Sequence, residues 1–236
     1  MRSFQILIGL LLVMGISVVA GHGLSGVPEQ AATGSGGMSS QVSAGTFPKD
    51  VYPETGNRLP PVKREDLDET GKKLFDMRGP GGAFGPGGIR LYSTPVADYM
   101  NGVNDFLRHK SGLDPKLVEL AILVTARELD CEYVWTAHEP QGLKAGLPQE
   151  TVDIVKYRKP VSGLGEKEAV IIQLGRESIG KHQVSSGTAA RAISLFGNQG
   201  FVNMVSLMGD YASTSILLSA FDQHVRPADK PLLPIP

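Results

Sequence analysis

The 236-residue sequence lacks several features that identify common classes of protein. Its single cysteine excludes a disulfide within the chain. Its 23 basic and 24 acidic side chains nearly cancel, which argues against nucleic acid or an anionic membrane surface as the main partner. No segment alternates apolar and polar residues up to a hairpin turn, so a sheet is not expected. No histidines, cysteines or carboxylates have the spacing of a metal site, and we predict no metal.

The N-terminus has the pattern of a targeting segment. Arg2 precedes an apolar stretch, Ile6–Ala20, that is too short to span a membrane comfortably. The small residues before Gly21 suit cleavage after Ala20. We therefore expect a signal peptide over residues 1–20, export of the protein to the periplasm or medium, and no membrane contact after cleavage. The alternative is an uncleaved anchor.

Residues 21–57 are rich in glycine, serine and proline, show no periodicity, and are expected to form a disordered linker. From residue 58 to 236 the apolar residues recur at helical spacing, which predicts one compact all-α domain. The tail from Lys230 is expected to lie over the surface as an extended strap, because its prolines exclude a helix. The expected helices are Glu65–Met77, Pro95–Lys110, Lys116–Leu129, one from Asp130 to about Gly146, 148–158, Glu166–Gly180, Ser185–Phe196 and Gly200–His224.

The stretch from Asp130 to His138 holds the only tryptophan, the only cysteine and a histidine. If Asp130 caps the helix that follows it, the field at the start of that helix favours the thiolate of Cys131. A buried, inert thiol is the usual alternative. His138 follows two turns later, about 10.5 Å along the axis, so it cannot hydrogen-bond Cys131. The histidine therefore needs another partner, either a main-chain carbonyl or a carboxylate.

Glu119 is the candidate partner, because it lies in an otherwise apolar run. Burial would raise the pKa of this carboxyl and suit it to proton transfer near neutral pH. The alternative is an ion pair with Lys116 or Arg127. Tyr133 and Trp135 are typical of core or subunit contacts, and Trp135 is expected to wall the pocket.

A loop rich in glycine and proline runs from Arg78 to Arg90 around Phe84. It lacks the Gly-Lys-Ser/Thr ending of a phosphate-binding loop. Two interpretations stay open. The loop is either a connector, or a flap that lays Phe84 over a pocket and brings Arg78 or Arg90 to a carboxylate.

The chain resembles the carboxymuconolactone decarboxylase family, which includes the alkyl hydroperoxidases of the antioxidant dithiol type. The resemblance covers about Arg58 to Phe221. It is carried by Leu-Val-Glu-Leu-Ala-Ile-Leu-Val-Thr-Ala-Arg over 117–127, Cys-Glu-Tyr-Val-Trp-Thr-Ala-His-Glu-Pro over 131–140 and Lys-Ala-Gly-Leu over 144–147, with support from Phe84-Gly-Pro, Tyr92-Ser-Thr-Pro and Phe196-Gly.

The resemblance implies an all-helical fold that self-associates, often as a trimer or hexamer. The hydroperoxidase pattern, a Glu, then C-x-x-C, then His, falls on Glu119, Cys131, position 134 and His138. Position 134 is valine, so the thiol that the histidine would activate is missing. Members without that cysteine resemble the decarboxylases, which act without a cofactor. The resemblance then gives Glu119 and His138 proton-transfer roles, with Arg78, Arg90 or Arg127 holding carboxylates.

Three hypotheses follow. The first is a cofactor-free decarboxylase or proton-transfer enzyme that acts on a small carboxylated lactone or enol. The second is a hydroperoxide reductase or redox sensor of the peroxiredoxin type that uses Cys131 alone, and the third is a non-catalytic helical assembly protein. A weak similarity also aligns Leu117–His138 with Phe201–Asp222, which would make the second segment a degenerate internal repeat.

Overall fold

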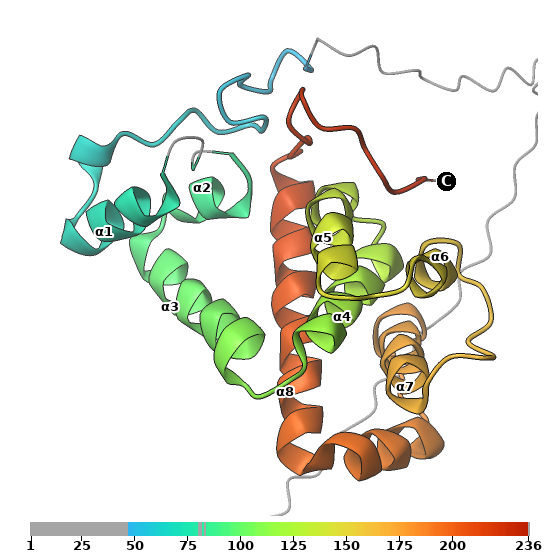
Figure 1. Cartoon of the computed structure of the whole chain (residues 1–236). Helices are drawn as coiled ribbons and strands as arrows, with labels where there is room; N and C mark the ends of the chain where they lie inside the picture. The colour runs from blue at the N-terminus through green and yellow to red at the C-terminus, as the bar shows by residue number, and fades with distance from the viewer. Residues whose placement is uncertain (1–46, 80–81, 83, 236) are drawn as a thin grey trace, which may run out of the picture. The chain divides into compact units, whose positions relative to one another are not determined.

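The computed structural model describes residues 47–79, 82 and 84–235 (Figure 1). The predicted signal peptide and most of the predicted linker lie outside these residues. Within them the fold is helical, as predicted, and the residues form no strand beyond one isolated bridge, between Tyr52 and Asn57. The elements are η1 Arg64–Asp66, α1 Glu69–Arg78, α2 Pro86–Arg90, α3 Thr94–Asp105, η2 Phe106–Lys110, α4 Pro115–Glu128, α5 Glu132–Lys144, α6 Gln149–Lys156, α7 Glu166–Gly175, η3 Arg176–Gly180 and α8 Ser186–Ala220.

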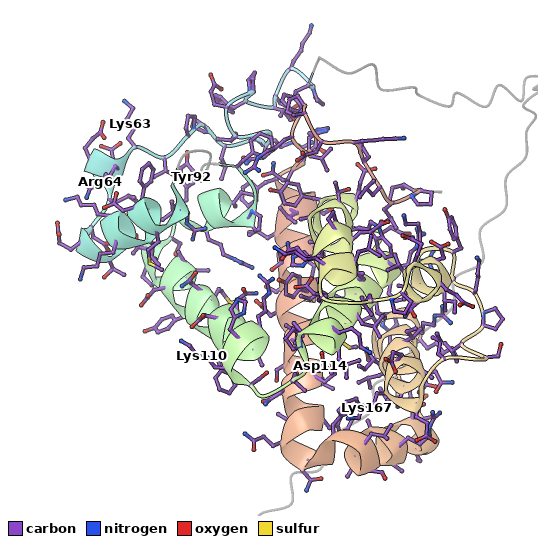
Figure 2. The ribbon with its side chains drawn as sticks, in the orientation of Figure 1. Lys63, Arg64, Tyr92, Lys110, Asp114 and Lys167 are labelled. Atoms are coloured by element: carbon purple, nitrogen blue, oxygen red, sulfur yellow. The ribbon has the colours of Figure 1, made fainter. Side chains whose placement is uncertain are left out.

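Helix α4 forms the centre of the core. The Asp114 side chain caps its first turn by accepting from the Lys116 N–H, and Pro115 supplies the fixed φ of a first helical residue. Its residues from Leu117 to Arg127 are all buried, because α5, α7 and α8 pack around it (Figure 1). Figure 2 labels Lys110 and Asp114 at the two ends of the loop that leads into this helix.

Helix α5 begins one residue later than predicted. Asp130 does not cap it: its backbone has a left-handed φ of 49°, and Cys131 occupies the cap position without a side-chain hydrogen bond. The Asp130 carboxylate instead pairs with Arg127, at 2.7 Å. The helix ends before Gly146, whose φ of 96° suits a residue without a Cβ.

Helix α3 and the π-helical turn η2 replace the single helix predicted over residues 95–110. The apolar face of these two elements is largely uncovered, since Tyr99 is 74% exposed and only Ala97 and Leu107 are buried. The other exposed members of this face are Val96, Val103 and Phe106. A continuous apolar face on solvent is typical of a surface that meets another molecule.

The folded region begins earlier than the predicted boundary at residue 58. Val51 is 5% exposed, and Tyr52 bridges to Asn57. The Gln223 amide fixes this segment by donating to the carbonyls of Thr55 and Gly56. Residues 47–57 are therefore part of the fold and not of the linker, because their main-chain groups have partners beyond the end of α8.

The C-terminal strap follows the prediction. It is extended, with Leu233 buried, the Leu232 N–H donating to Thr136 Oγ1, and Arg127 donating to the Pro234 carbonyl. The two segments aligned as a repeat differ, because the first contains the break between α4 and α5 whereas the second lies in continuous α8 helix up to Ala220. Among the described residues, no helix is long and apolar enough to cross a membrane.

Candidate active site

The predicted contact between Glu119 and His138 is present. Glu119 Oε2 lies 2.7 Å from His138 Nδ1, and both side chains are nearly buried. Glu119 comes from the middle of α4 and His138 from the second turn of α5, so packing of these two helices creates the pair. The alternatives for Glu119, an ion pair with Lys116 or Arg127, are not formed: Lys116 pairs with Glu168 and Arg127 with Asp130.

Arg108 holds the other oxygen of the same carboxylate. Its Nη2 lies 3.0 Å from Glu119 Oε1 and 3.1 Å from Gln141 Oε1. Arg108 belongs to η2, and Gln141 is the residue one turn after His138 on α5. One guanidinium therefore joins three elements around the histidine.

The prediction of a raised pKa for Glu119 is wrong. Burial does raise the pKa of this carboxyl, but the hydrogen bond to His138 and the charges of His138 and Arg108 outweigh it and lower the pKa below its usual value. Glu119 is thus an ionised carboxylate, which can only accept hydrogen bonds. It accepts a hydrogen bond from Nδ1–H of His138, and this fixes the tautomer of the neutral ring.

The ring of His138 packs edge-on against Tyr211 of α8, with ring centroids 5.1 Å apart. Burial raises the pKa of Tyr211 to about 12, so it stays a neutral phenol. Asn104 of α3 donates to Asp210 Oδ2 at 2.8 Å, beside this tyrosine. The second oxygen of Asp210 is buried without a hydrogen bond in the described part of the chain.

A cavity of about 290 Å³ opens beside His138. Its wall carries three arginines and, among the described residues, no carboxylate. Such a cavity favours an anionic ligand, because it gathers positive charge on one concave wall. The lining residues are Arg78, Pro86, Gly87, Arg90, Ala97, Met100, Asn101, Asn104, Arg108, Tyr133, Val134, Ala137, His138, Tyr211 and Thr214.

Arg78 and Arg90 reach this cavity from the end of α1 and from α2. Arg90 Nη2 donates to Thr214 Oγ1 at 2.7 Å, whereas Arg78 Nε is buried with no partner in the described region. Burial lowers the pKa of Arg78, and the charge of Arg90 lowers it further. Two partly buried guanidinium groups that repel one another are stabilised by an anion between them.

Several predicted site residues lie away from the cavity. Trp135 is fully buried on another side of α5, where its indole N–H donates to Glu139 and Lys156 lies over its ring. Phe84 packs on Gly56, with Arg226 5.6 Å from the ring centroid, so it is an anchor and not a flap over the cavity. Arg127 is 3% exposed and pairs with Asp130 and the strap, so it cannot hold a carboxylate of a ligand in this cavity.

Cys131 faces a different cavity, of about 220 Å³, that includes Asp130, Glu132 and Asp222 in its wall. Burial raises the pKa of the thiol, against a hydrogen bond from Ser215 that lowers it. The N–H groups of Tyr133 and Val134 at the start of α5 also lower this pKa, as expected, but burial outweighs them. The thiol therefore fits the alternative of a buried, inert cysteine. Tyr133 lines both cavities and stands between them.

Sequence reasoning missed Arg108, Asn104 and Tyr211. Their signal was present but ambiguous, because Asn104 and Arg108 are four residues apart and so share one helical face. The sequence could not show that this face turns toward α5 and α8. No group of three or more histidines, cysteines or carboxylates within the described residues is arranged to hold a metal ion.

The comparisons with known proteins agree with the resemblance at the level of the family. The model described as "Carboxymuconolactone decarboxylase family" matches residues 94–171, from the start of α3 into α7. No curated protein and no solved structure matches the chain significantly. The matched range contains Glu119, Cys131, Val134 and His138 as well as Arg108. Residues 94–171 therefore belong to the carboxymuconolactone decarboxylase family.

Proposed function

We propose that this protein is a cofactor-free enzyme that decarboxylates, or moves a proton on, a small carboxylated lactone or enol. The observation that carries the proposal is the pairing of His138 with ionised Glu119 on the wall of a cavity that has three arginines and no lining carboxylate. The arginines supply recognition of an anion, and the histidine supplies a proton donor and acceptor. The family description supports the reaction class.

In the proposed reaction, Arg78 and Arg90 hold carboxylate or carbonyl oxygens of the ligand. The substrate class is a lactone in which a ring double bond lies between the ring carbonyl and the saturated carbon that bears the departing carboxylate. The carbon–carbon bond to that carboxylate breaks, CO2 leaves, and the electron pair moves into the ring to give an enolate. The arginines stabilise the charge that collects on the enolate oxygen.

His138 completes the reaction by adding a proton to a ring carbon of the enolate. Its Nδ1 is occupied by Glu119, whereas Nε2 makes no hydrogen bond to any of the described residues. In its imidazolium form the ring donates this proton from Nε2, while Glu119 accepts the hydrogen bond from Nδ1. The neutral ring then recovers a proton from solvent, so one turnover consumes one proton and releases one CO2.

The test is turnover of a panel of carboxylated unsaturated lactones, followed by CO2 release and by the uptake of deuterium from D2O at the ring carbon. His138→Asn is expected to lower kcat by at least about a hundredfold, the usual contribution of a general acid or base. His182→Asn is the matched control, because His182 is exposed and outside the cavity. Equal turnover by the two variants would refute the role of His138.

The single-thiol alternative is disfavoured by the surroundings of Cys131. A peroxide-reducing cysteine needs an accessible thiolate, whereas burial raises the pKa of this thiol and carboxylates share its cavity. The assembly hypothesis is separated from the enzyme by the same lactone panel, since a non-catalytic protein would turn over none of its members.

We also propose that the protein is exported and forms homo-oligomers, as trimers or hexamers. The apolar N-terminal stretch supports export. The uncovered apolar face of α3 and η2, defined above, supports self-association. Cell fractionation and light scattering coupled to size-exclusion chromatography test the two points, and a monomer at micromolar concentration would contradict the second.

A further inference from the structure

The guanidinium group of Arg108 is only partly used by the protein. Both hydrogen bonds that it forms with the described residues come from Nη2, which donates to Glu119 and Gln141. Nε is buried without a partner, and Nη1 makes no hydrogen bond with this part of the chain either. Because guanidinium donors are rarely left unpaired in a partly buried site, the free donors suit a ligand.

Arg108 also lies where two cavities approach each other. It lines the cavity beside His138, and with Glu119 it lines a second, more open cavity of about 590 Å³. Arg108 thus borders both spaces, and Glu119 borders the second. Arg108 is held in this position by a π-helical turn, a local irregularity that is often found at functional sites.

We propose that Arg108 couples ligand binding to protonation of the Glu119–His138 pair: one nitrogen holds Glu119, and the free donors take an anionic group of the ligand. Binding of the anionic ligand then favours protonation of the Glu119–His138 pair. The free enzyme thereby gains its reactive proton as the substrate arrives. The inference rests on the proposed function only in requiring that the cavity bind an anion.

The physical reason is a competition for one positive charge. In the empty cavity Arg108 stabilises the Glu119 carboxylate and opposes a positive charge on His138. An anion on Arg108 neutralises part of that charge and adds negative charge near the ring, and both effects favour the imidazolium. The titratable and charged groups that face His138 are Glu119 from α4, Arg108 from η2, Arg78 and Arg90 from the α1 and α2 side of the cavity, Tyr211 from α8 and Tyr133 from α5 itself.

The experiment uses malonate as the probe and does not depend on turnover. Calorimetry gives the malonate affinity of the full-length protein, and NMR of the imidazole nitrogens of His138 gives the pH at which the ring titrates with and without malonate. In the unaltered protein malonate is expected to raise the proton affinity of the ring by about tenfold. Arg108→Gln is expected to weaken malonate binding at least about tenfold, the effect of one charge-assisted contact, and to remove most of the rise.

Two further variants keep the result interpretable. Arg108→Lys retains the charge next to Glu119 but has no planar fork, so it should keep the fold and still bind malonate more weakly. Arg64→Gln is the matched control, since Arg64 pairs with Asp76 on the surface, away from both cavities. Unchanged malonate affinity in both Arg108 variants would overturn the proposal, as would a full rise in proton affinity in Arg108→Gln. If the unaltered protein turned over no lactone but malonate gave the results expected here, the proposed reaction would be wrong and the role of Arg108 would stand.

Discussion

Replacing Gly87 with alanine is a sharp test of the anion site, because the substitution acts on Arg78 without altering it. A Cβ at Gly87 would lie 1.5 Å from Nη1 and 2.6 Å from Cζ of Arg78. Gly87 is in α2, where alanine has no backbone conflict, and the atoms it meets belong to the flexible end of a side chain. The guanidinium must therefore move, and we expect it to leave its place on the cavity wall.

The magnitude follows from the contact that is lost. A hydrogen bond to a charged group contributes about 1.5–3 kcal/mol, and each 1.4 kcal/mol is a factor of about ten in affinity. Malonate should therefore bind roughly tenfold to a hundredfold more weakly to Gly87→Ala. Stability should change by less than about 1 kcal/mol, since alanine is favoured over glycine within a helix and offsets part of the lost packing of Arg78.

The assay is calorimetric titration with malonate, together with urea unfolding of the same samples. Gly102→Ala is the matched control, because this glycine lies in α3 and an added Cβ meets nothing within 4 Å. The control should bind malonate normally. If Gly87→Ala also bound malonate with the affinity of the unaltered protein, Arg78 would have no part in anion binding.

The remaining predictions concern Glu119, Trp135 and Cys131. The pKa of Glu119 is lowered from 4.5, because the hydrogen bond to His138 and the charges of His138 and Arg108 outweigh burial. The ionised carboxylate therefore stabilises the fold above pH 4.5. This contribution is lost as the pH falls through the lower pKa of the folded state. In urea unfolding, Glu119→Gln should flatten this loss below 4.5, and an unchanged slope would contradict the assignment. Trp135→Phe removes the indole N–H that donates to buried Glu139, and in the same assay it should lower the free energy of unfolding by about 1–3 kcal/mol. Malonate binding should not change, because Trp135 does not line the cavity. Since burial raises the pKa of Cys131, iodoacetamide should label it more slowly than a free thiol at neutral pH, with the rate rising into the alkaline range, as read by mass spectrometry. Cys131→Ser should leave lactone turnover intact, and a loss of turnover would return the thiol to the reaction.

The sequence was sufficient for those parts of the fold that local signals determine. Asp114 and Pro115 identify the start of α4, and its run of apolar residues identifies it as central. The partnership of Glu119 with His138 was also predictable, because an acid in an apolar helix and a histidine on the next helix both need partners. Long segments of consistent periodicity and the polar residues that interrupt them therefore gave correct predictions.

The failures concern properties that depend on several elements at once. The pKa of Glu119 was predicted from burial alone, whereas the hydrogen bond to His138 and the charges of His138 and Arg108 together reverse its direction. Trp135 was expected to wall the pocket beside His138, but two residues three apart on a helix are separated by about 60°, enough for one to face a cavity and the other the core. For Phe84 and Arg127 the sequence contained no indication that the N-terminal segment and the C-terminal strap would supply their partners.

The separation of Cys131 from His138 by Val134 bears on which chemistry the fold can support. A dithiol peroxidase must pass a proton between its histidine and a thiol one turn away, and Val134, which is 3% exposed, can neither accept nor donate one. The two residues also face cavities of opposite character, one with carboxylates in its wall and the other with arginines. An anionic substrate would be attracted to His138 and repelled from Cys131. The carboxylates beside Cys131 disfavour a thiolate, and the arginines beside His138 favour an enolate. The valine at position 134 and the charges of the two walls therefore both favour proton transfer at His138 over redox chemistry at Cys131.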